Sequence, residues 1–208
     1  IRDRNKASVT LFTSFNPGSG KTFLTMNTAA TFAMKGKRIL VIDGDLRRGS
    51  ASAYLGSQHK GLSDYLGKRE SCLDALVQEN PDIPGFFLLP AGTIPPNPTE
   101  LLAEPLFKET IEQLRGHYDY ILIDCPPIDI VADTQIIEKL ADRTVFVVRA
   151  GLLERDMLSE LQRMYDEKRF KNMALLLNGT EGGGNRYGYR YGYKYGYKYG
   201  YGSKNYYK

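Results

Sequence analysis

The sequence predicts an α/β fold in which a mainly parallel sheet carries helices on both faces. Two observations lead to this prediction. Short apolar runs alternate with longer segments of helical periodicity, and a glycine-rich loop joins the first apolar run to the first helical segment. Alternation of this kind implies right-handed crossovers between parallel strands. A chain of 208 residues has room for one domain of ordinary size and a tail.

Six apolar runs are expected to form the strands, and several are apolar on both faces, as strands buried inside a parallel sheet must be. These strands are expected at residues 8–13, 38–43, 86–90, 118–124, 144–149 and 173–178. The helices are expected at about 22–34, 98–114, 133–140 and 154–168. Asn97 is the expected cap of the second helix, because Pro98 suits the first helical position.

Charge is distributed unevenly along the chain. The formal net charge is +4, but six basic residues and no acidic one lie from Arg186 onward, so the rest is slightly acidic. That part is not expected to bind nucleic acid. No run approaches the ~20 apolar residues of a membrane span. The chain starts with neither a signal-peptide pattern nor a methionine, so we expect a piece of a longer protein. Two cysteines without CxxC spacing suggest a reducing cytoplasm and no metal site.

The chain is expected to divide into a globular domain over residues 1–178, a flexible linker over 179–186 and a tyrosine-rich tail over 187–208. The linker is rich in glycine, and the repeat beyond it has no apolar face to offset the entropy lost on ordering. We therefore expect the tail to be disordered. Its tyrosines are Tyr187, Tyr189, Tyr191, Tyr193, Tyr195, Tyr197, Tyr199, Tyr201, Tyr206 and Tyr207.

The stretch NPGSGKT follows the first expected strand and leads into a helix, which is the context of a phosphate-binding loop. Gly18 and Gly20 let backbone N–H groups turn toward a polyphosphate, and the helix N-terminus adds the positive end of its dipole. Lys21 would reach the β and γ oxygens, and Thr22 would hold Mg²⁺. The first glycine of G-x-x-x-x-G-K-[ST] is replaced by Phe15. The alternative is a glycine-rich turn with an incidental lysine.

Three aspartates close two of the expected strands. Asp43 and Asp45 follow the second strand, and Asp124 ends the strand YILID before two prolines. Open α/β sheets bind ligands at the carboxyl ends of their strands, and carboxylates there can bind Mg²⁺ directly or through water. Taken alone, the pair Asp43 and Asp45 could equally form a turn or cap a helix. Beside a phosphate loop, a nucleotide site is favoured.

Together these motifs resemble the cytoplasmic kinase domain of the bacterial tyrosine kinases (BY-kinases) that control capsule and exopolysaccharide synthesis. The resemblance rests on NPGSGKT, ILVIDGDLR, ILIDCPP, GLSDYL, LPAGTIPPNPTELL and the terminal tyrosines, and it covers nearly all of residues 8–178. It implies a P-loop NTPase-like fold, ATP and Mg²⁺ as cofactors, and transfer of phosphate from ATP to tyrosine.

The resemblance also implies roles for single residues. Arg47 matches the arginine beside the acidic pair of the family, and Asn178 resembles an asparagine that contacts adenine in related ATPases, although a strand-end asparagine is otherwise often a turn residue. The predicted catalytic residues are Lys21, Asp43, Asp45 and Arg47, with Asp45 as the proton acceptor. The predicted metal ligands are Thr22, Asp43 and Asp124. The predicted nucleotide contacts are Pro17, Gly18, Ser19, Gly20, Lys21, Thr22, Phe23 and Asn178.

Partners are expected from the resemblance alone. Kinase domains of the family form rings through an upstream helix with an E-x-x-R-x-x-R pattern, which is missing from this sequence. The expected partners are other copies of the chain in the intact protein, a transmembrane polysaccharide chain-length regulator, fused or separate, and a cognate tyrosine phosphatase. The expected location is the cytoplasmic face of the bacterial inner membrane.

Three functions compete for this sequence. The first is a tyrosine kinase that phosphorylates its own tail in trans, with all ten tail tyrosines as acceptors. The second is a partition or cell-division type switch ATPase of the same fold. Those ATPases carry a signature lysine four positions before the last glycine of the loop, where this chain has Asn16. The third is a tail that binds nucleic acid or itself through stacking and cation–π contacts.

Overall fold

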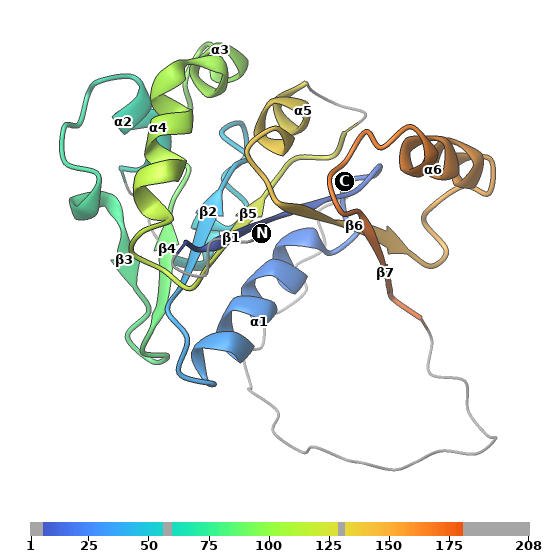
Figure 1. Ribbon diagram of the computed structural model, residues 1–208, viewed down its shortest axis with the longest axis horizontal. Coiled ribbons are helices and arrows are strands. Elements are labelled where there is room, and N and C mark those ends of the chain that lie inside the picture. Colours follow the sequence, from blue (N-terminus) through green and yellow to red (C-terminus); the bar gives the residue numbers. More distant parts are fainter. Residues whose placement is uncertain (1–5, 56–59, 129–131, 181–208) are drawn as a thin grey trace, which may run out of the picture.

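A computed structural model describes residues 6–55, 60–128 and 132–180 of the protein. These residues form a seven-stranded sheet in the order β3-β4-β2-β5-β1-β6-β7 (Figure 1). Every neighbouring pair is parallel except β3 and β4. The predicted α/β fold is confirmed. The tail tyrosines and most of the predicted linker lie outside the described residues.

The described elements follow one another in strand and helix alternation. The strands are β1 (Ser8–Thr13), β2 (Ile39–Asp43), β3 (Gln78–Glu79), β4 (Phe86–Leu89), β5 (Tyr120–Asp124), β6 (Arg143–Arg149) and β7 (Ala174–Asn178). The α-helices are α1 (Lys21–Ala33), α2 (Leu62–Leu66), α3 (Pro98–Ala103), α4 (Pro105–Leu114), α5 (Asp133–Glu138) and α6 (Met157–Asp166). Two short 3₁₀ helices are η1 (Ser52–Leu55) and η2 (Asp74–Leu76).

The expected helix over residues 98–114 is in fact two helices, so that prediction was wrong at its centre. Glu104 has extended backbone angles, with φ −63° and ψ 143°, between α3 and α4. Pro105 explains the break, because a proline excludes the helical conformation from the residue before it and then suits the first position of a new helix. Asn97 does occupy the N-cap position of α3, but its side chain makes no capping hydrogen bond.

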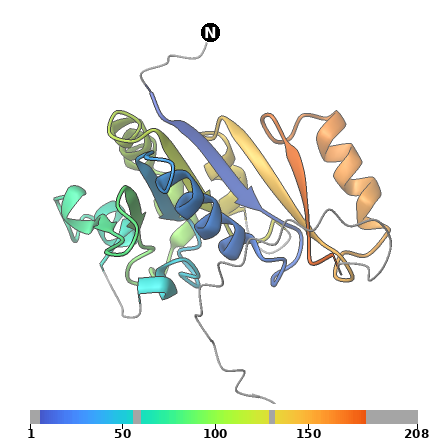
Figure 2. The ribbon, with the colours of Figure 1, turned by 90° about the horizontal axis from the view of Figure 1, so that it is seen from below.

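Helices cover the two faces of the sheet, as Figures 1 and 2 show. On one face, Met26 and Ala29 of α1 pack against Ile39 and Val41 of β2. On the other face, residues of α3, α4 and α5 pack in one buried cluster with the alternate residues of the central strands, and they include Leu40, Ile42, Leu102, Phe107, Ile111 and Ile137. Strands β1, β2 and β5 are buried along nearly their whole length, as expected for parallel strands between two helical layers.

Two stretches that carried the family resemblance pack on each other rather than on the phosphate loop. In GLSDYL, which contains α2, Ser63 donates its hydroxyl to the carbonyl of Thr93 at 2.5 Å. The carboxylate of Asp64 accepts the backbone N–H groups of Gly61 and Thr93, both at 3.0 Å. These stretches therefore form a structural unit beside the site.

None of the described helices is long and apolar enough to cross a membrane.

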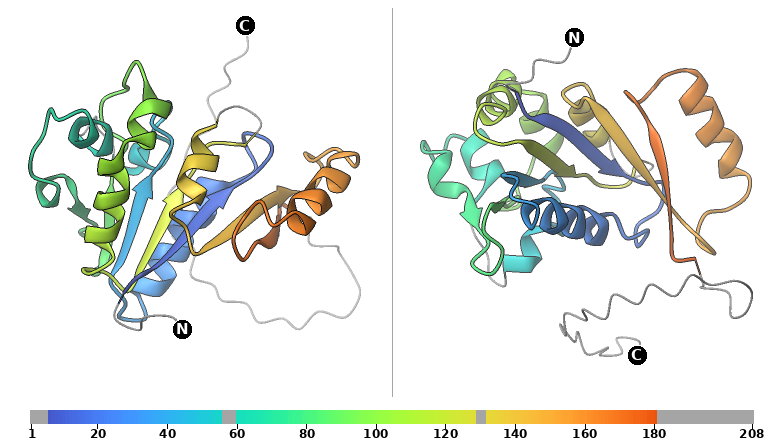
Figure 3. Two further views of the ribbon diagram at one scale, coloured as in Figure 1. Left: turned by 45° about the horizontal axis from the view of Figure 1, so that its top comes forward. Right: turned by 60° about the horizontal axis from the view of Figure 1, so that its bottom comes forward.

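The carboxyl ends of the parallel strands bring distant polar residues to one edge. Thr13, Asp43, Asp124, Arg149 and Asn178 are the last residues of β1, β2, β5, β6 and β7. Figure 3 shows β7 beside β6 at the outer side of the sheet. The loops that follow these strands are therefore the natural place for a ligand.

Candidate active site

The loop between β1 and α1 has the backbone of a phosphate-binding loop. Gly18 has φ +74° and Gly20 has φ +92°, a left-handed conformation that side chains rarely adopt. A Cβ atom added at Gly18 would meet nothing within 4 Å, so the space beside the loop is open. Gly20 is also the N-cap of α1, whose first N–H groups are left without helical partners. These groups can donate hydrogen bonds to a bound anion.

Two strand-end side chains hold this loop from outside. Asn178 donates its amide to the carbonyl of Ser19 at 2.9 Å, and Arg149 donates its guanidinium to the carbonyl of Gly18 at 2.7 Å. Because these two carbonyls are engaged by strand-end side chains, the N–H groups of the loop can face the opposite side, where a phosphate would bind. Asn178 thus reaches the loop, and its contact with adenine stays a prediction. Arg149 was missed by the sequence analysis, and its only signal was its place at a strand end.

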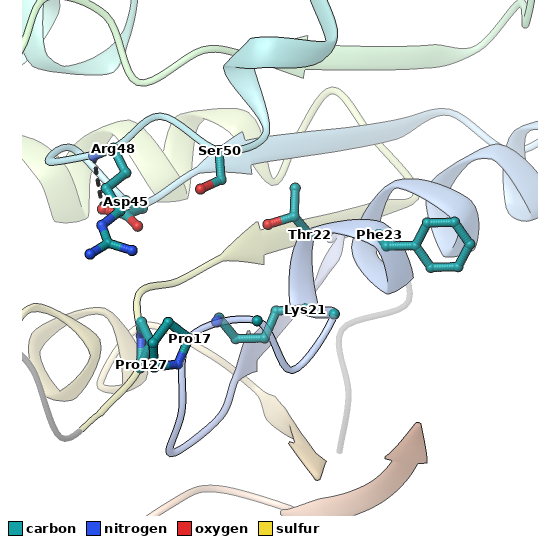
Figure 4. A pocket seen from close by; sticks show the side chains of 10 residues that line it. Pro17, Lys21, Thr22, Phe23, Asp45, Arg48, Ser50 and Pro127 are labelled. Atoms are coloured by element: carbon teal, nitrogen blue, oxygen red, sulfur yellow. Dashed lines mark hydrogen bonds between the residues drawn. The ribbon is translucent and has the colours of Figure 1, made fainter. Parts of the chain in front are cut away.

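An open pocket of about 210 Å³ lies between this loop and the segment after β2 (Figure 4). Its lining residues are Pro17, Gly18, Gly20, Lys21, Thr22, Phe23, Asp45, Arg48, Ser50 and Pro127. Seven of these were predicted, whereas Arg48, Ser50 and Pro127 were not. The predicted residues that do not line it are Ser19, Asp43, Arg47, Asp124 and Asn178. In Figure 4 the ring of Phe23 points away from Asp45.

Lys21 is largely buried at the base of the pocket, with 8% of its surface exposed. Burial lowers the pKa of Lys21 below its ordinary value, against the raising effect of the charges on Asp124 and Asp45. A buried ammonium group close to an open pocket favours an anionic ligand, because the ligand supplies the counter-charge that solvent cannot.

Thr22 and Asp124 form the most direct contact across the site. The hydroxyl of Thr22 donates to Oδ2 of Asp124 at 2.6 Å, whereas Oδ1 of Asp124 is buried without a hydrogen-bond partner among the described residues. Burial raises the pKa of Asp124 to about 7, although the hydrogen bond from Thr22 lowers it. A buried, unsatisfied carboxylate oxygen is costly, and a cation would satisfy it.

Asp43 is engaged by its own chain. Its Oδ2 accepts both the backbone N–H and the hydroxyl of Ser52 at 2.7 Å, and its Oδ1 accepts the backbone N–H of Asp45 at 3.2 Å. Burial raises the pKa of Asp43 to about 6, against the lowering effect of the hydrogen bonds from Ser52. Asp43 therefore shapes the segment that carries Asp45 instead of lining the pocket.

Arg47 and Arg48 point to different sides of that segment. Oδ1 of Asp45 accepts the backbone N–H groups of Arg47 at 3.2 Å and of Arg48 at 3.1 Å. The side chain of Arg48 lines the pocket, whereas Nε of Arg47 lies 3.0 Å from Oδ2 of Asp133. The structure thus places Arg47, the predicted catalytic arginine, outside the pocket and its neighbour Arg48 at the pocket wall.

The described side chains do not make a complete metal site. Among residues 6–55, 60–128 and 132–180, no group of three or more His, Cys, Asp or Glu side chains is arranged to hold a metal ion. Mg²⁺ commonly binds through one or two carboxylates together with substrate phosphates. Thr22 and Oδ1 of Asp124 fit that mode, because they supply two oxygen ligands and leave the remaining positions to a bound nucleotide.

Comparison with known proteins agrees with this geometry. A family model described as "AAA domain" matches residues 8–166. The tyrosine-protein kinase CpsD of Streptococcus pneumoniae is 37% identical over 163 residues, which cover 77% of this chain and 71% of CpsD. The putative tyrosine-protein kinase AmsA of Erwinia amylovora is 40% identical over 164 residues, which cover 78% of this chain and 22% of AmsA.

Solved structures show the same likeness. The kinase domain of the Escherichia coli tyrosine kinase ETK superposes with a TM-score of 0.78 and 31% identity, over 92% of this chain and 74% of that chain. The septum site-determining protein MinD of Pyrococcus horikoshii, solved with Mg-ADP, has a TM-score of 0.67 and 24% identity over 82% of this chain and 70% of its own, a likeness of fold alone. The chain therefore belongs to the family of bacterial tyrosine-protein kinases that includes CpsD and ETK.

Proposed function

We propose that this chain transfers the γ-phosphoryl group of Mg·ATP to tyrosine hydroxyls, foremost those of its own C-terminal tail presented by another copy. The observation that carries the proposal is the pocket itself. Phosphate-loop residues Lys21 and Thr22 form one wall, and Asp45 and Arg48 form the facing wall. A polyphosphate bound to the loop would therefore point its terminal group at a carboxylate and a guanidinium.

The phosphates are held by the backbone N–H groups of residues 18–22, by Lys21 and, in place of Arg47, by Arg48. Mg²⁺, when bound by Thr22, Asp124 and the nucleotide, neutralises the negative charge that repels an incoming hydroxyl. Asp43, predicted as a further magnesium ligand, has both carboxylate oxygens engaged by Ser52 and by the N–H of Asp45. We therefore assign Asp43 to holding the segment that carries Asp45.

Asp45 is the proposed proton acceptor. A tyrosine hydroxyl has a pKa near ~10, so its oxygen becomes a good nucleophile only as the proton leaves. In the proposed step the proton passes to the Asp45 carboxylate, the phenolic oxygen bonds to the γ-phosphorus, and the bond to the β,γ-bridging oxygen breaks to release ADP. Lys21 stabilises the negative charge that develops on the transferring group.

The tail suits this site in charge and in backbone. From Arg186 onward it carries six basic residues and no acidic one, whereas the site holds Asp43, Asp45 and Asp124. Glycine between the tyrosines lets an extended segment enter a narrow site with little steric cost. We also propose a polysaccharide chain-length regulator in the membrane, fused or separate, and a tyrosine phosphatase as partners in the intact system, at the cytoplasmic face of the inner membrane.

The second candidate function, a switch ATPase, is supported only by the fold that this chain shares with such ATPases. MinD has the same architecture, but at position 16, where those ATPases carry their signature lysine, this chain has asparagine. The carbonyl of Asn16 accepts the hydroxyls of Ser14 at 2.7 Å and of Ser19 at 2.8 Å, so its backbone serves to fold the loop. Tyrosine transfer is therefore the better supported activity.

Substitution of Lys21 by methionine tests the proposal. We expect Lys21→Met to abolish tyrosine phosphorylation of the tail, while the melting temperature without nucleotide stays equal to or above that of wild type, because a buried ammonium group is removed. Anti-phosphotyrosine blotting after incubation with Mg·ATP gives the activity. A Lys21→Met protein that phosphorylates its tail at the wild-type rate would exclude this site as the kinase centre.

A further inference from the structure

The first residue of α5, Asp133, is the buried member of a cluster of polar side chains that includes Arg47. Asp133 is fully buried, while the side chain of its partner Arg47 is 40% exposed. Arg47 places Nε 3.0 Å from Oδ2 of Asp133 and donates through a terminal nitrogen to the hydroxyl of Thr99 at 2.9 Å. The Thr99 hydroxyl in turn donates to Oδ1 of Asp133 at 2.5 Å. This cluster joins α3, α5 and the segment after β2.

The next residue of α5, Thr134, contacts the segment that follows β5. The hydroxyl of Thr134 donates to the carbonyl of Pro126 at 2.9 Å, and the hydroxyl of Thr13 donates to the same carbonyl at 3.0 Å. Pro126 precedes Pro127, which lines the pocket. Both threonines are fully buried. Two adjacent residues of α5 thus hold two separate segments that line the pocket.

We infer that Asp133 and Thr134 are positioning residues for phosphoryl transfer, which fix Asp45, Arg48 and Pro127 around the phosphates through Arg47 and Pro126. This inference rests on the proposed kinase function. It says that Asp133 and Thr134 hold the residues of the site in place without touching nucleotide or tyrosine. Neither residue was singled out by the sequence. The partners of Asp133 lie far away along the chain, and Thr134 belongs to no motif.

Asp133 would act on Asp45 through the backbone of residues 45–48. Asp133 fixes the guanidinium of Arg47, and the N–H of Arg47 is one of two that orient the carboxylate of Asp45. With Arg47 turned inward to α5, Arg48 is left to face the pocket. A shift of this backbone would move the proposed proton acceptor, and misplacement by ~1 Å can cost about 10²-fold in rate.

Lys21 and Thr22 are held independently of this cluster, because they stand on α1, whereas the side chain of Asp133 bonds Arg47 and Thr99. Nucleotide binding through the phosphate loop should therefore survive a change at Asp133, and a displaced Arg48 should weaken it only slightly. This separation distinguishes positioning of the transfer step from a general loss of structure. It predicts a fall in kcat with little change in the KM for Mg·ATP.

The experiment measures transfer between two distinguishable copies of the full chain. The enzyme carries phenylalanine at all ten tail tyrosines, and the acceptor is the Lys21→Met chain with its natural tail. We expect Asp133→Asn and Arg47→Met, each placed in the enzyme copy, to lower kcat about 10-fold and to change the KM for Mg·ATP less than about 3-fold. The double variant should be no slower than the slower single variant, because both changes break one contact.

A second pair of variants addresses Thr134 and separates its hydroxyl from its packing. Thr134→Val removes the hydrogen bond to Pro126 and should lower kcat, whereas Thr134→Ser keeps the hydroxyl and should restore it. These variants and Arg47→Met, at a partly exposed site, decide the matter even where Asp133→Asn fails to fold. The matched control is Asp142→Asn, which breaks another Arg–Asp pair, with Arg115, away from the pocket. It should leave kcat unchanged.

The outcomes separate the two proposals. If the unsubstituted enzyme copy fails to label the acceptor, the proposed function is wrong. If it labels the acceptor and Asp133→Asn and Thr134→Val both work at the full rate, the kinase assignment stands and the positioning role is wrong. Effects of Arg47→Met and Asp133→Asn that multiply in the double variant would also overturn the inference.

Discussion

Each end of the sheet holds an aspartate paired with an arginine, and the two ends differ in whether every oxygen of their buried or half-buried aspartates has a partner. At the amino end, Arg115 lies 2.7 Å from Asp142 and donates to the carbonyls of Ala7 at 2.8 Å and Leu140 at 2.9 Å. At the carboxyl end, Arg47 pairs with Asp133, but Asp124 keeps a buried oxygen without a partner among the described residues. Nε of Arg115 makes no hydrogen bond within the described part of the chain but lies 3.1 Å from Oε1 of Glu112. Both oxygens of Asp142 have partners within the chain, whereas Asp124 has an oxygen that a ligand could satisfy.

The pKa values follow the same contrast. Burial alone would raise the pKa of Asp142, but hydrogen bonds from Arg115 and from the N–H of Val9 hold it below its ordinary value. At the other end, burial raises the pKa of Asp43 to about 6 and that of Asp124 to about 7. The fold thus stabilises the charged form of Asp142 at the amino end of the sheet. It destabilises the charged forms of Asp43 and Asp124 at the carboxyl end, where a cation is expected to bind.

The largest expected effect is at the carboxyl end. Asp45→Asn should lower the rate of tyrosine phosphorylation by about 10²-fold or more, because a positioned proton acceptor contributes at least that much. Binding of Mg·ADP, measured by calorimetry, should persist. The assignment of Asp45 as proton acceptor is wrong if Asp45→Asn fails to bind Mg·ADP.

The next effect concerns stability without nucleotide or Mg²⁺. Asp124 binds a proton in the folded state between pH about 4 and about 7, where the unfolded chain has lost it, so its contribution to stability falls as pH rises through that range. Asp124→Asn should therefore be more stable than wild type at pH 8, by about 2 kcal/mol. The gain should shrink as pH falls toward 4.

Urea unfolding of both proteins across this pH range, in buffer containing a chelator, measures the difference. Added Mg·ADP should stabilise wild type and have a much smaller effect on Asp124→Asn. A substituted protein that is less stable than wild type at pH 8 would show that the buried carboxylate is satisfied in some other way.

The smallest effect is expected at the amino end. Asp142→Asn should lower stability at pH 7 by about 1 kcal/mol, because nearly half of the Asp142 side chain is exposed and solvent screens its charge. The folded-state pKa is lowered, so this contribution is present above pH about 4 and is lost as pH falls through the folded-state pKa. Chemical denaturation at pH 7 and in acid checks it, and a loss that persists in acid would point to packing instead of charge.

Sequence patterns predicted the features that local chemistry determines. The strands were predicted within about two residues, since apolar runs and turn residues are local, and the phosphate loop was predicted because consecutive residues build it. Strand β3 was missed, because two residues give no pattern. Helix α2 was missed as well, since it has only five residues and its N-cap residue, Gly61, has no side chain to form a cap.

The rest of the site depends on long-range contacts that no local pattern contains. Nothing in the pair Arg47 and Arg48 says which of them faces the pocket, because Asp133 decides it from a distant part of the chain. The place of Asp43 at a strand end predicted a metal ligand, but its Oδ2 accepts two hydrogen bonds from Ser52. Family resemblance assigned Asn178 to adenine, which stays a prediction, and its contact with Ser19 could not be foreseen.

The position of β1 between β5 and β6, inside the sheet, has a consequence for the order of folding. Ser8 pairs with Tyr120 and Thr10 pairs with Arg143, so the strand that leads into the phosphate loop has no sheet partner until β5 and β6 exist. During synthesis the ribosome must therefore release most of the chain before the nucleotide loop can be fixed between its neighbours. Pairing across such long separations makes folding slow, and a nascent chain stopped before residue 120 should have no nucleotide affinity.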